Sequence, residues 1–144
     1  MRAALALLVL GTACSSPEQD TAQVRWHDYG TFVNDVQPVL AEHCGNASCH
    51  GRPERPLAVY SVRRYRMDPA RTHVDEALTD EELRHNYTLS CVLSSEGDGP
   101  SHTLLLEKPL GSAAAVYHGG GDVFEATTDR DYRVLLAWVE TGWP

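Results

Sequence analysis

The sequence predicts an all-α domain with long loops. Three segments carry apolar residues at helical spacing: about 32–43, a segment that begins at Thr79, and about 129–141. Strand signals are few, and stretches rich in glycine or proline separate the helical segments. A mature chain of about 130 residues can bury one modest core. We therefore expect a single domain over residues 31–144.

The N-terminus has the pattern of a secretory signal peptide. A positively charged start, Met1-Arg2, precedes the apolar run 3–10 (AALALLVL), and small residues follow at 11–13. The apolar run is too short to span a bilayer, which takes about 20 residues. We therefore expect residues 1–13 to be removed on export.

The small residues before Cys14 resemble the lipobox of bacterial lipoproteins, a family in which this cysteine becomes the first mature residue and carries lipid. Gly11 departs from the family pattern, because a leucine is usual three places before the cysteine. An ordinary signal peptide cut near Ala13, without lipid, is the alternative. The resemblance implies lipidation at Cys14, a tether over 14–30 and a place in the cell envelope, on the periplasmic side or the cell surface. Since Ser15 follows the cysteine, the outer membrane is favoured.

The charge of the chain narrows its partners. The sequence has 20 Asp and Glu against 12 Lys and Arg, which gives a formal net charge of -8. The absence of a basic stripe from the sequence argues against binding to nucleic acid. Thiols outside the cytoplasm seldom stay free, so the four cysteines are of special interest.

The first helix is expected over about 32–43, where apolar residues recur at four-residue spacing and form one face. Pro38 fits best in the first turn of a helix, where its missing amide proton breaks no hydrogen bond. A helix that starts near Val36 would place it there and would run directly into Cys44.

The second helix has the clearest start signal. Thr79 and Glu82 have the spacing of a capping box, in which the Thr79 hydroxyl accepts from the Glu82 amide and the Glu82 carboxylate reaches back. Tyr87 and Cys91 then share the apolar face of the helix. The stretch GDGP at 97–100 ends it.

Two further helical segments are expected towards the C-terminus. A short one covers 101–107 and is stopped by Pro109, and the glycine-rich stretch 111–121 (GSAAAVYHGGG) follows as a loop. The last helix covers about 129–141, with Asp129 as a good N-cap.

The string CGNASCH at 44–50 is the most informative part of the sequence. The common haem-attachment motif is C-x-x-C-H, whereas four residues separate Cys44 from Cys49 here, and His50 follows. Two thiols must reach two vinyl groups on one porphyrin edge, and the histidine must point at the iron. A longer insert can bulge outward without moving these three side chains. From the spacing alone, a Cys44–Cys49 disulfide competes about equally with haem attachment, and a zinc site comes third.

Three ordered segments resemble the planctomycete- and myxobacterial-type cytochrome c domains. FVNDVQPVLAEHCGNASCHG (32–51) is similar to the start of such a domain, SHTLLLEKPL (101–110) to its Ser-x-Leu-Leu-x-Lys segment, and LLAWVETGWP (135–144) to its closing Leu-x-x-Trp-Ile-x-x-Gly helix. The resemblance covers about residues 30–144 and is weak over 57–98.

This resemblance implies a cytochrome c-like helical domain with long loops around one haem. The haem would be covalent haem c, bound to Cys44 and Cys49, with His50 as an iron ligand. The family's usual Met-Pro-Pro loop is missing, and HGGG at 118–121 stands in its place, so His118 is the first candidate for the other ligand. A loop histidine without such a role is an equal alternative, and Met67 is the second candidate ligand.

The remaining cysteine and the arginines have plainer expectations. Cys91 is expected to pack as a small apolar side chain, although it could pair with Cys44 or Cys49 if haem is absent. The arginines of 51–78 are expected on a solvated loop, with pairing of one or two to haem propionates as the alternative. Surface positions are expected for His27, His43, His73, His85 and His102.

The expected function is electron transfer by a c-type cytochrome with an unidentified redox partner protein. Neither a phosphate-binding loop nor a Ser-His-Asp spacing is evident in the sequence, so we do not expect an enzyme. The alternative is a disulfide-stapled envelope lipoprotein with a binding or scaffold role and no haem. A small zinc domain comes third.

Overall fold

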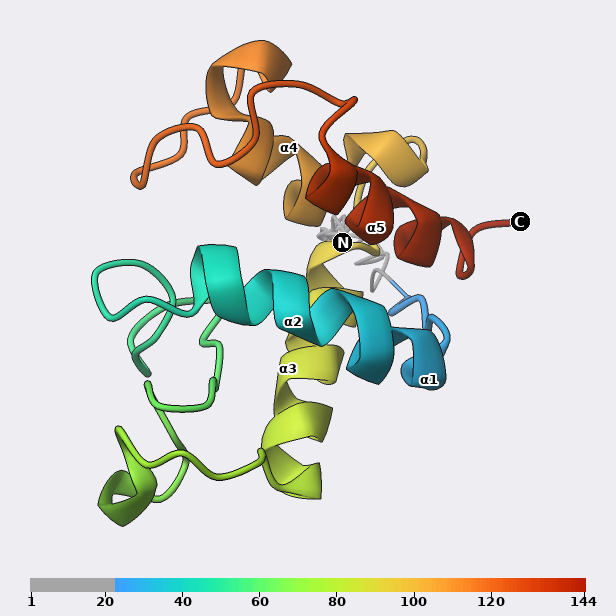
Figure 1. Ribbon diagram of the computed structural model, residues 1–144. Coiled ribbons are helices and arrows are strands. Elements are labelled where there is room, and N and C mark those ends of the chain that lie inside the picture. The colour runs from blue at the N-terminus through green and yellow to red at the C-terminus, as the bar shows by residue number, and fades with distance from the viewer. Residues whose placement is uncertain (1–22) are drawn as a thin grey trace, which may run out of the picture.

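The computed structural model describes residues 23–144, and its regular elements are all helices (Figure 1). The all-α prediction is therefore confirmed for this part of the chain. The signal peptide, the lipidation at Cys14 and the first part of the tether lie outside the described residues. Within the described part, no helix is long and apolar enough to cross a membrane.

The first helix is continuous from Tyr29 to Cys44 but changes its winding. It consists of α1 (Tyr29–Thr31), the π-helical segment η1 (Phe32–Val36), α2 (Gln37–Val39) and the π-helical segment η2 (Leu40–Cys44).

The predicted start near Val36 is wrong. The helix begins at Tyr29, where the Asp28 carboxylate is the N-cap and accepts from the Thr31 amide at 2.6 Å. Pro38 therefore lies in the middle of the helix. Wide π turns on both sides of Pro38 move the hydrogen bonds to carbonyls five residues back, which accommodates a residue without an amide proton.

The helix α3 (Asp80–Leu93) begins as the sequence predicts. Both halves of the Thr79–Glu82 capping box are formed, and the acidic residues of the first turn suit the positive end of the helix dipole. After α3 the chain turns through η4 (Pro100–His102) into α4 (Leu104–Leu110).

The prediction that Pro109 stops the helix α4 is wrong by a few residues. The helix runs through Pro109 to Leu110 and continues as η5 (Gly111–Ala114). The buried Pro109 carbonyl accepts from the amides of Val123 and Phe124, at 2.8 and 3.0 Å, so tertiary contacts fix this turn.

The last helix, α5 (Arg130–Glu140), has Asp129 at its N-cap position as predicted, although the Asp129 carboxylate accepts from Glu125 and Ala126 instead of the helix amides. Figure 1 shows α4 and α5 together on one side of the first helix, with α3 crossing it. Their apolar faces meet in one core, and burial of a large side chain contributes about 1.5–3 kcal/mol. Its most buried members include Phe32, Val36, Leu40, Leu106, Leu135 and Trp138.

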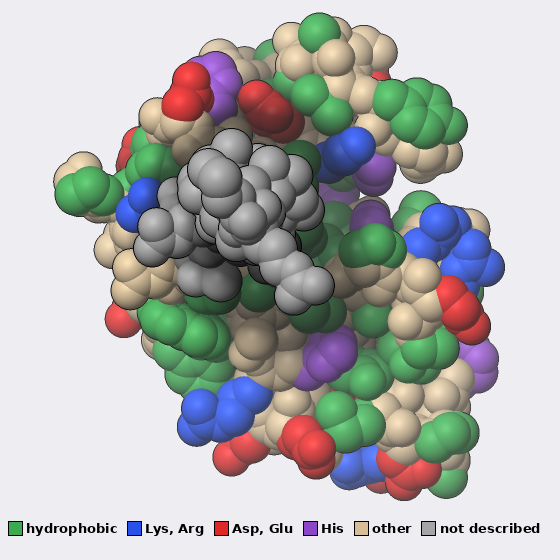
Figure 2. All heavy atoms as spheres, turned by 180° about the vertical axis from the view of Figure 1, so that it is seen from behind, with side chains coloured by type: hydrophobic (Ala, Val, Ile, Leu, Met, Phe, Trp, Pro, Cys, Tyr) green, Lys and Arg blue, Asp and Glu red, His purple; other side chains and the backbone are tan. Residues whose placement is uncertain are grey.

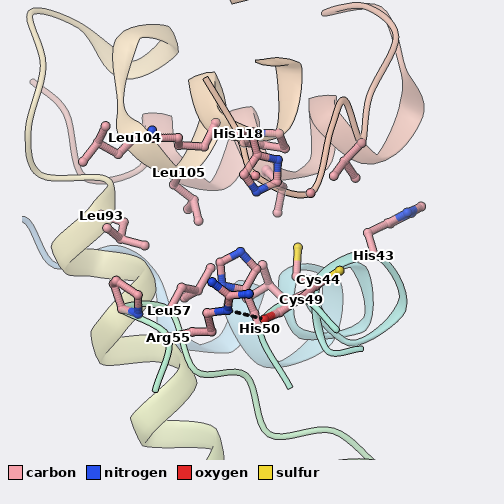
Figure 3. A pocket seen from close by; sticks show the side chains of 18 of the residues that line it. His43, Cys44, Cys49, His50, Arg55, Leu57, Leu93, Leu104, Leu105 and His118 are labelled. Carbon is pink, nitrogen blue, oxygen red and sulfur yellow. Dashed lines mark hydrogen bonds between the residues drawn. The ribbon is translucent and has the colours of Figure 1, made fainter. Parts of the chain in front are cut away.

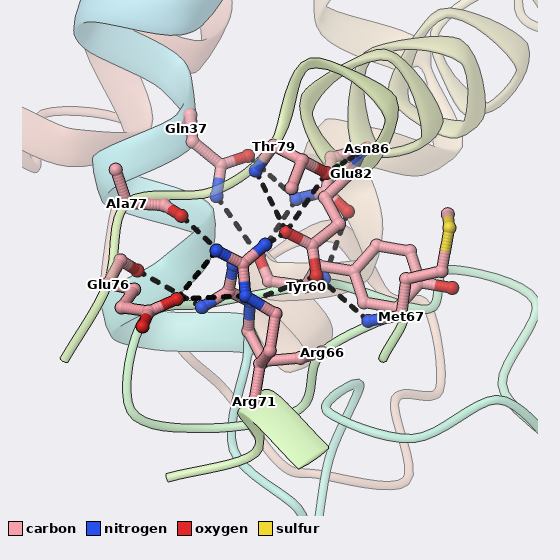
Figure 4. A network of polar contacts seen from close by, with 10 residues as sticks. All are labelled: Gln37, Tyr60, Arg66, Met67, Arg71, Glu76, Ala77, Thr79, Glu82 and Asn86. Atoms are coloured by element: carbon pink, nitrogen blue, oxygen red, sulfur yellow. Dashed lines mark hydrogen bonds and ion pairs between the residues drawn. The ribbon is translucent and has the colours of Figure 1, made fainter. Parts of the chain in front are cut away.

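The expectation of a solvated arginine loop is wrong for Arg66, which is 1% exposed (Figure 4). Its guanidinium binds the Glu82 carboxylate at 2.8 and 2.9 Å and also donates to the carbonyls of Glu76 and Ala77. Burial alone would raise the pKa of Glu82, but hydrogen bonds from Arg66 and from two backbone amides outweigh burial and lower the pKa to about 2. This network fastens the irregular segment before α3, including η3 (Pro69–Arg71), onto the helix.

His27 is also buried, against the expectation of a surface position. Its Nε2 lies 2.6 Å from Ser94 Oγ, and its ring lies 4.5 Å from that of Trp138. The ring fits because residue 142 is glycine: a Cβ there would collide with His27. Burial lowers the pKa of His27. The sequence carries no local signal for this packing, because the partners lie at residues 94, 138 and 142.

Candidate functional site

A pocket of about 600 Å³ opens between the end of the first helix and the loop that follows α4 (Figure 3). Its volume falls in the usual range for a bound cofactor or ligand. The apolar part of its lining comes from every major helix and includes Leu40, Leu57, Leu93, Leu104, Leu105 and Leu135.

One wall of the pocket, which we call the motif wall, is the segment 44–59. The helix delivers Cys44 to the pocket, and the Cys44 carbonyl accepts from the His50 amide at 3.0 Å. The Asn46 carbonyl accepts from the amides of Cys49 and Gly51, at 2.9 and 2.8 Å. The inserted residues of the long motif therefore form a compact turn that points outward, while Cys44, Cys49 and His50 all line the pocket.

His50 is held firmly in the motif wall. The Val59 amide donates to the His50 carbonyl at 2.8 Å. The next amide, that of Tyr60, donates to Asn86 Oδ1 of α3 at 3.0 Å. Burial lowers the pKa of His50, and the nearby Leu57 backbone offsets part of that effect. His50 Nδ1 is buried and makes no hydrogen bond of good geometry.

The opposite wall, which we call the loop wall, is the segment 111–122. The two hydrogen bonds to the Pro109 carbonyl close its base, and Lys108 Nζ donates to the Tyr117 carbonyl at 2.8 Å. His118 Nδ1 lies 2.7 Å from the Gly121 carbonyl. A carbonyl can only accept, so this bond places the proton on Nδ1 and leaves the lone pair on Nε2.

His50 and His118 face each other across the pocket (Figure 3). Their ring centroids lie 6.1 Å apart and their planes differ by 13°. Two imidazoles that hold one metal ion from opposite sides have centroids about 6 Å apart, because each metal–nitrogen bond is about 2 Å and each nitrogen lies about 1 Å from its ring centroid. The centroid separation of the pair is therefore compatible with two imidazoles on opposite sides of one metal ion.

The thiols beside this pair are unpaired. Cys44, Cys49 and Cys91 are free, and Cys91 lies buried in α3, outside the pocket lining. Burial, and secondly the neighbouring Cys49, raise the pKa of the Cys44 thiol to about 12. Among residues 23–144, no three His, Cys, Asp or Glu side chains form a ready metal site.

The structure does not bring Met67 into the pocket. Its amide donates to Glu82 Oε1 at 2.8 Å, and its side chain is 38% exposed. His43, expected at the surface, lines the pocket beside Cys44 and makes a 2.8 Å contact with Asp131 of α5. The helical spacing from Leu40 to His43 was a signal for this position, since residues three apart share a face.

The charged Arg and Lys side chains that line the pocket are of one sign. The lining includes Arg55 and Lys108 but no carboxylate among the residues that the structure describes, although acidic residues outnumber basic ones in the whole sequence. Arg55 Nε donates to the Cys49 carbonyl at 3.0 Å, which holds its guanidinium near the motif wall. An apolar ligand with a negative charge would suit this lining. No family model, curated protein or solved structure matches this chain.

Proposed function

We propose that this domain is a c-type cytochrome that carries one covalently attached haem and transfers electrons in the bacterial cell envelope. The observation that carries the proposal is the pair of facing imidazoles of His50 and His118, 6.1 Å apart, in an apolar pocket that also holds two free thiols. A covalent haem would need all of these features: two thiols, two histidines and an apolar pocket. A lipoprotein stapled by a Cys44–Cys49 disulfide would need no such pocket.

The two thiols would attach the cofactor. Each S–H of Cys44 and Cys49 would add across one vinyl group of the porphyrin, which would form a C–S bond and a C–H bond with no leaving group. The outward turn of the insert allows both thiols to line the same pocket despite the long spacing. In the proposed holoprotein, attachment also accounts for the two thiols that would otherwise stay free outside the cytoplasm.

The two histidines would ligate the iron through Nε2. The bond from His118 Nδ1 to the Gly121 carbonyl orients that ring, as a backbone carbonyl commonly does for a metal-bound histidine. Bound there, haem iron supplies reversible one-electron chemistry, and two imidazole ligands give a lower potential than His/Met ligation. The leucines of the lining exclude water, and Arg55 and Lys108 are the cations available to the cofactor's carboxylates.

The envelope location rests on the N-terminal sequence. The signal-peptide pattern of residues 1–13 and the small residues before Cys14 support export and lipid anchoring, with the outer membrane favoured. The redox partner would be a protein on the same side of that membrane. If His50 and His118 both hold the iron, the bound haem would supply one-electron transfer.

A pyridine haemochrome spectrum tests this function. The full chain would be exported with a cytochrome c maturation system, then extracted under denaturing conditions. A c-type band that stays with the polypeptide is the expected result. If the polypeptide keeps no haem and Cys44 is found oxidised to Cys49, the protein is a disulfide-stapled lipoprotein.

A further inference from the structure

Residues 24–28, at the start of the described chain, pack along α3. We call them the docked segment. The Arg25 amide donates to Ser95 Oγ at 2.7 Å, and Tyr87 Oη donates to the His27 carbonyl at 2.7 Å. With the buried His27–Ser94 contact, these bonds hold the segment in place on both sides of Trp26.

Trp26 nevertheless points its ring outward and is 59% exposed. It stacks on Tyr87 at 5.9 Å, and Tyr87 meets the edge of Tyr29 at 5.0 Å. We call this surface, together with its two bordering arginines, the aromatic face. Arg84 lies over the Tyr29 ring at 5.2 Å, and Arg25 lies over the ring of Trp143 at 4.0 Å. Figure 2 shows the molecule from behind, with hydrophobic side chains exposed over this face and basic side chains among them.

We propose that the aromatic face is a membrane-contact surface, which lays the domain on the phospholipid bilayer that holds its anchor. An exposed tryptophan such as Trp26 favours the membrane–water interface, where its ring is buried and its polar atom stays hydrated. Arginines at the border can bind headgroup phosphates. Asp28, the carboxylate within the docked segment, is engaged as the N-cap of α1.

The position of the anchor selects a bilayer as the occupant. Only residues 14–22 separate the proposed lipidated cysteine from the described chain, and nine residues span at most roughly 30 Å. Residues 15–22 (SSPEQDTA) are polar or small and offer no large apolar side chain to cover Trp26. The inference rests on the proposed lipid anchor and is independent of haem.

The orientation has a consequence for the redox partner. The rings of the aromatic face, and Trp143 beside Arg25, do not line the pocket. A domain that rests on this face therefore keeps the pocket mouth open, including Tyr117, which is 86% exposed.

Vesicle binding by the unlipidated protein tests the aromatic face. The mature full chain with Cys14→Ser would be mixed with vesicles of phosphatidylethanolamine and a minority of phosphatidylglycerol, and the bound fraction measured by sedimentation. Trp26→Ser is expected to weaken binding roughly tenfold, because a large aromatic ring loses its buried position. Tyr117→Ser, which removes the other highly exposed aromatic ring, is the matched control and should bind like the parent.

Three results would overturn the proposal: no binding by the parent, equal binding by the parent and Trp26→Ser, or a dimer in solution that depends on Trp26. Circular dichroism melts of each variant establish that the variants are folded. The haemochrome spectrum of the same samples reports separately on the cofactor, so a failure here and a failure of the proposed function are distinguishable.

Discussion

The two walls of the pocket are built differently, although each supplies one of the facing histidines. The motif wall grows from a helix end, and backbone bonds at Cys44, Asn46 and His50 fix it. The loop wall is tied at its base, and His118 is oriented only by its bond to Gly121 within the same loop. The comparison shows that backbone bonds at a helix end place His50, whereas the path of a loop places His118.

The largest expected effect is on the motif wall. Replacement His50→Ala should lower the yield of covalent haem protein by at least about tenfold, because cofactor binding and folding of the pocket are coupled. The measurement is the haemochrome band per polypeptide after export. His102→Ala, an exposed histidine outside the pocket, is the control and should leave the yield unchanged. A normal yield from His50→Ala would contradict its assignment.

A substitution on α3, which packs against the motif wall, is expected to destabilise the domain. The Tyr60 amide bonds to Asn86 of α3, and the Val59 amide bonds to the His50 carbonyl. Glu82, which binds Arg66, lies on the same helix four residues before Asn86. Glu82→Ala leaves the buried guanidinium without its partner and should lower the free energy of unfolding by about 3–5 kcal/mol. Urea denaturation measures this. The exposed neighbour provides the control, since Glu81→Ala should change the free energy by at most about 0.5 kcal/mol.

A pair of glycine replacements compares the walls directly. A Cβ at Gly51 would collide with the Gly45 carbonyl oxygen, whereas a Cβ at Gly120 would lie 3.5 Å from His118 Cε1. Gly51→Ala should therefore lower the unfolding free energy by about 1–3 kcal/mol, and Gly120→Ala by at most about 0.5 kcal/mol. Thermal melts monitored by circular dichroism measure the loss of stability in each variant. Equal losses would mean that the two walls are equally rigid.

A further prediction concerns the acid dependence of stability. The pKa of Glu82 is about 2 in the folded protein, below its ordinary value of 4.5, so the unfolded state takes up the proton first. The stabilisation from Glu82 is full above about pH 4.5 and is lost as the pH falls towards 2, with a slope of at most about 1.4 kcal/mol per pH unit. Urea midpoints across this range should show a shallower slope for Glu82→Gln than for Glu81→Gln.

Local signals in the sequence predicted local structure well. The Thr79–Glu82 box marks the start of α3 because both partners lie within four residues. Features that depend on distant residues were missed: Arg66 is buried because Glu82 and two carbonyls receive it, and the helix passes Pro109 because residues 123 and 124 bond to its carbonyl.

The candidate site divides in the same way. The sequence indicated residues 44–50 as a candidate site because the two cysteines and His50 lie within seven residues. The position of His118 opposite His50 depends on the path of a loop closed from residues 109 to 124. The helical spacing from Leu40 indicated the pocket side for His43, whereas its contact with Asp131 on α5 has no local signal in the sequence.

The most direct test of the central claim is the electron paramagnetic resonance spectrum of the oxidised, exported protein together with its His118→Ala variant. The account predicts low-spin ferric haem with two imidazole ligands in the parent. In the variant it predicts haem that stays covalently bound but becomes high-spin, and added imidazole should restore the low-spin signal. An identical low-spin spectrum from parent and variant would contradict the role of His118, and a parent without iron would contradict the cytochrome itself.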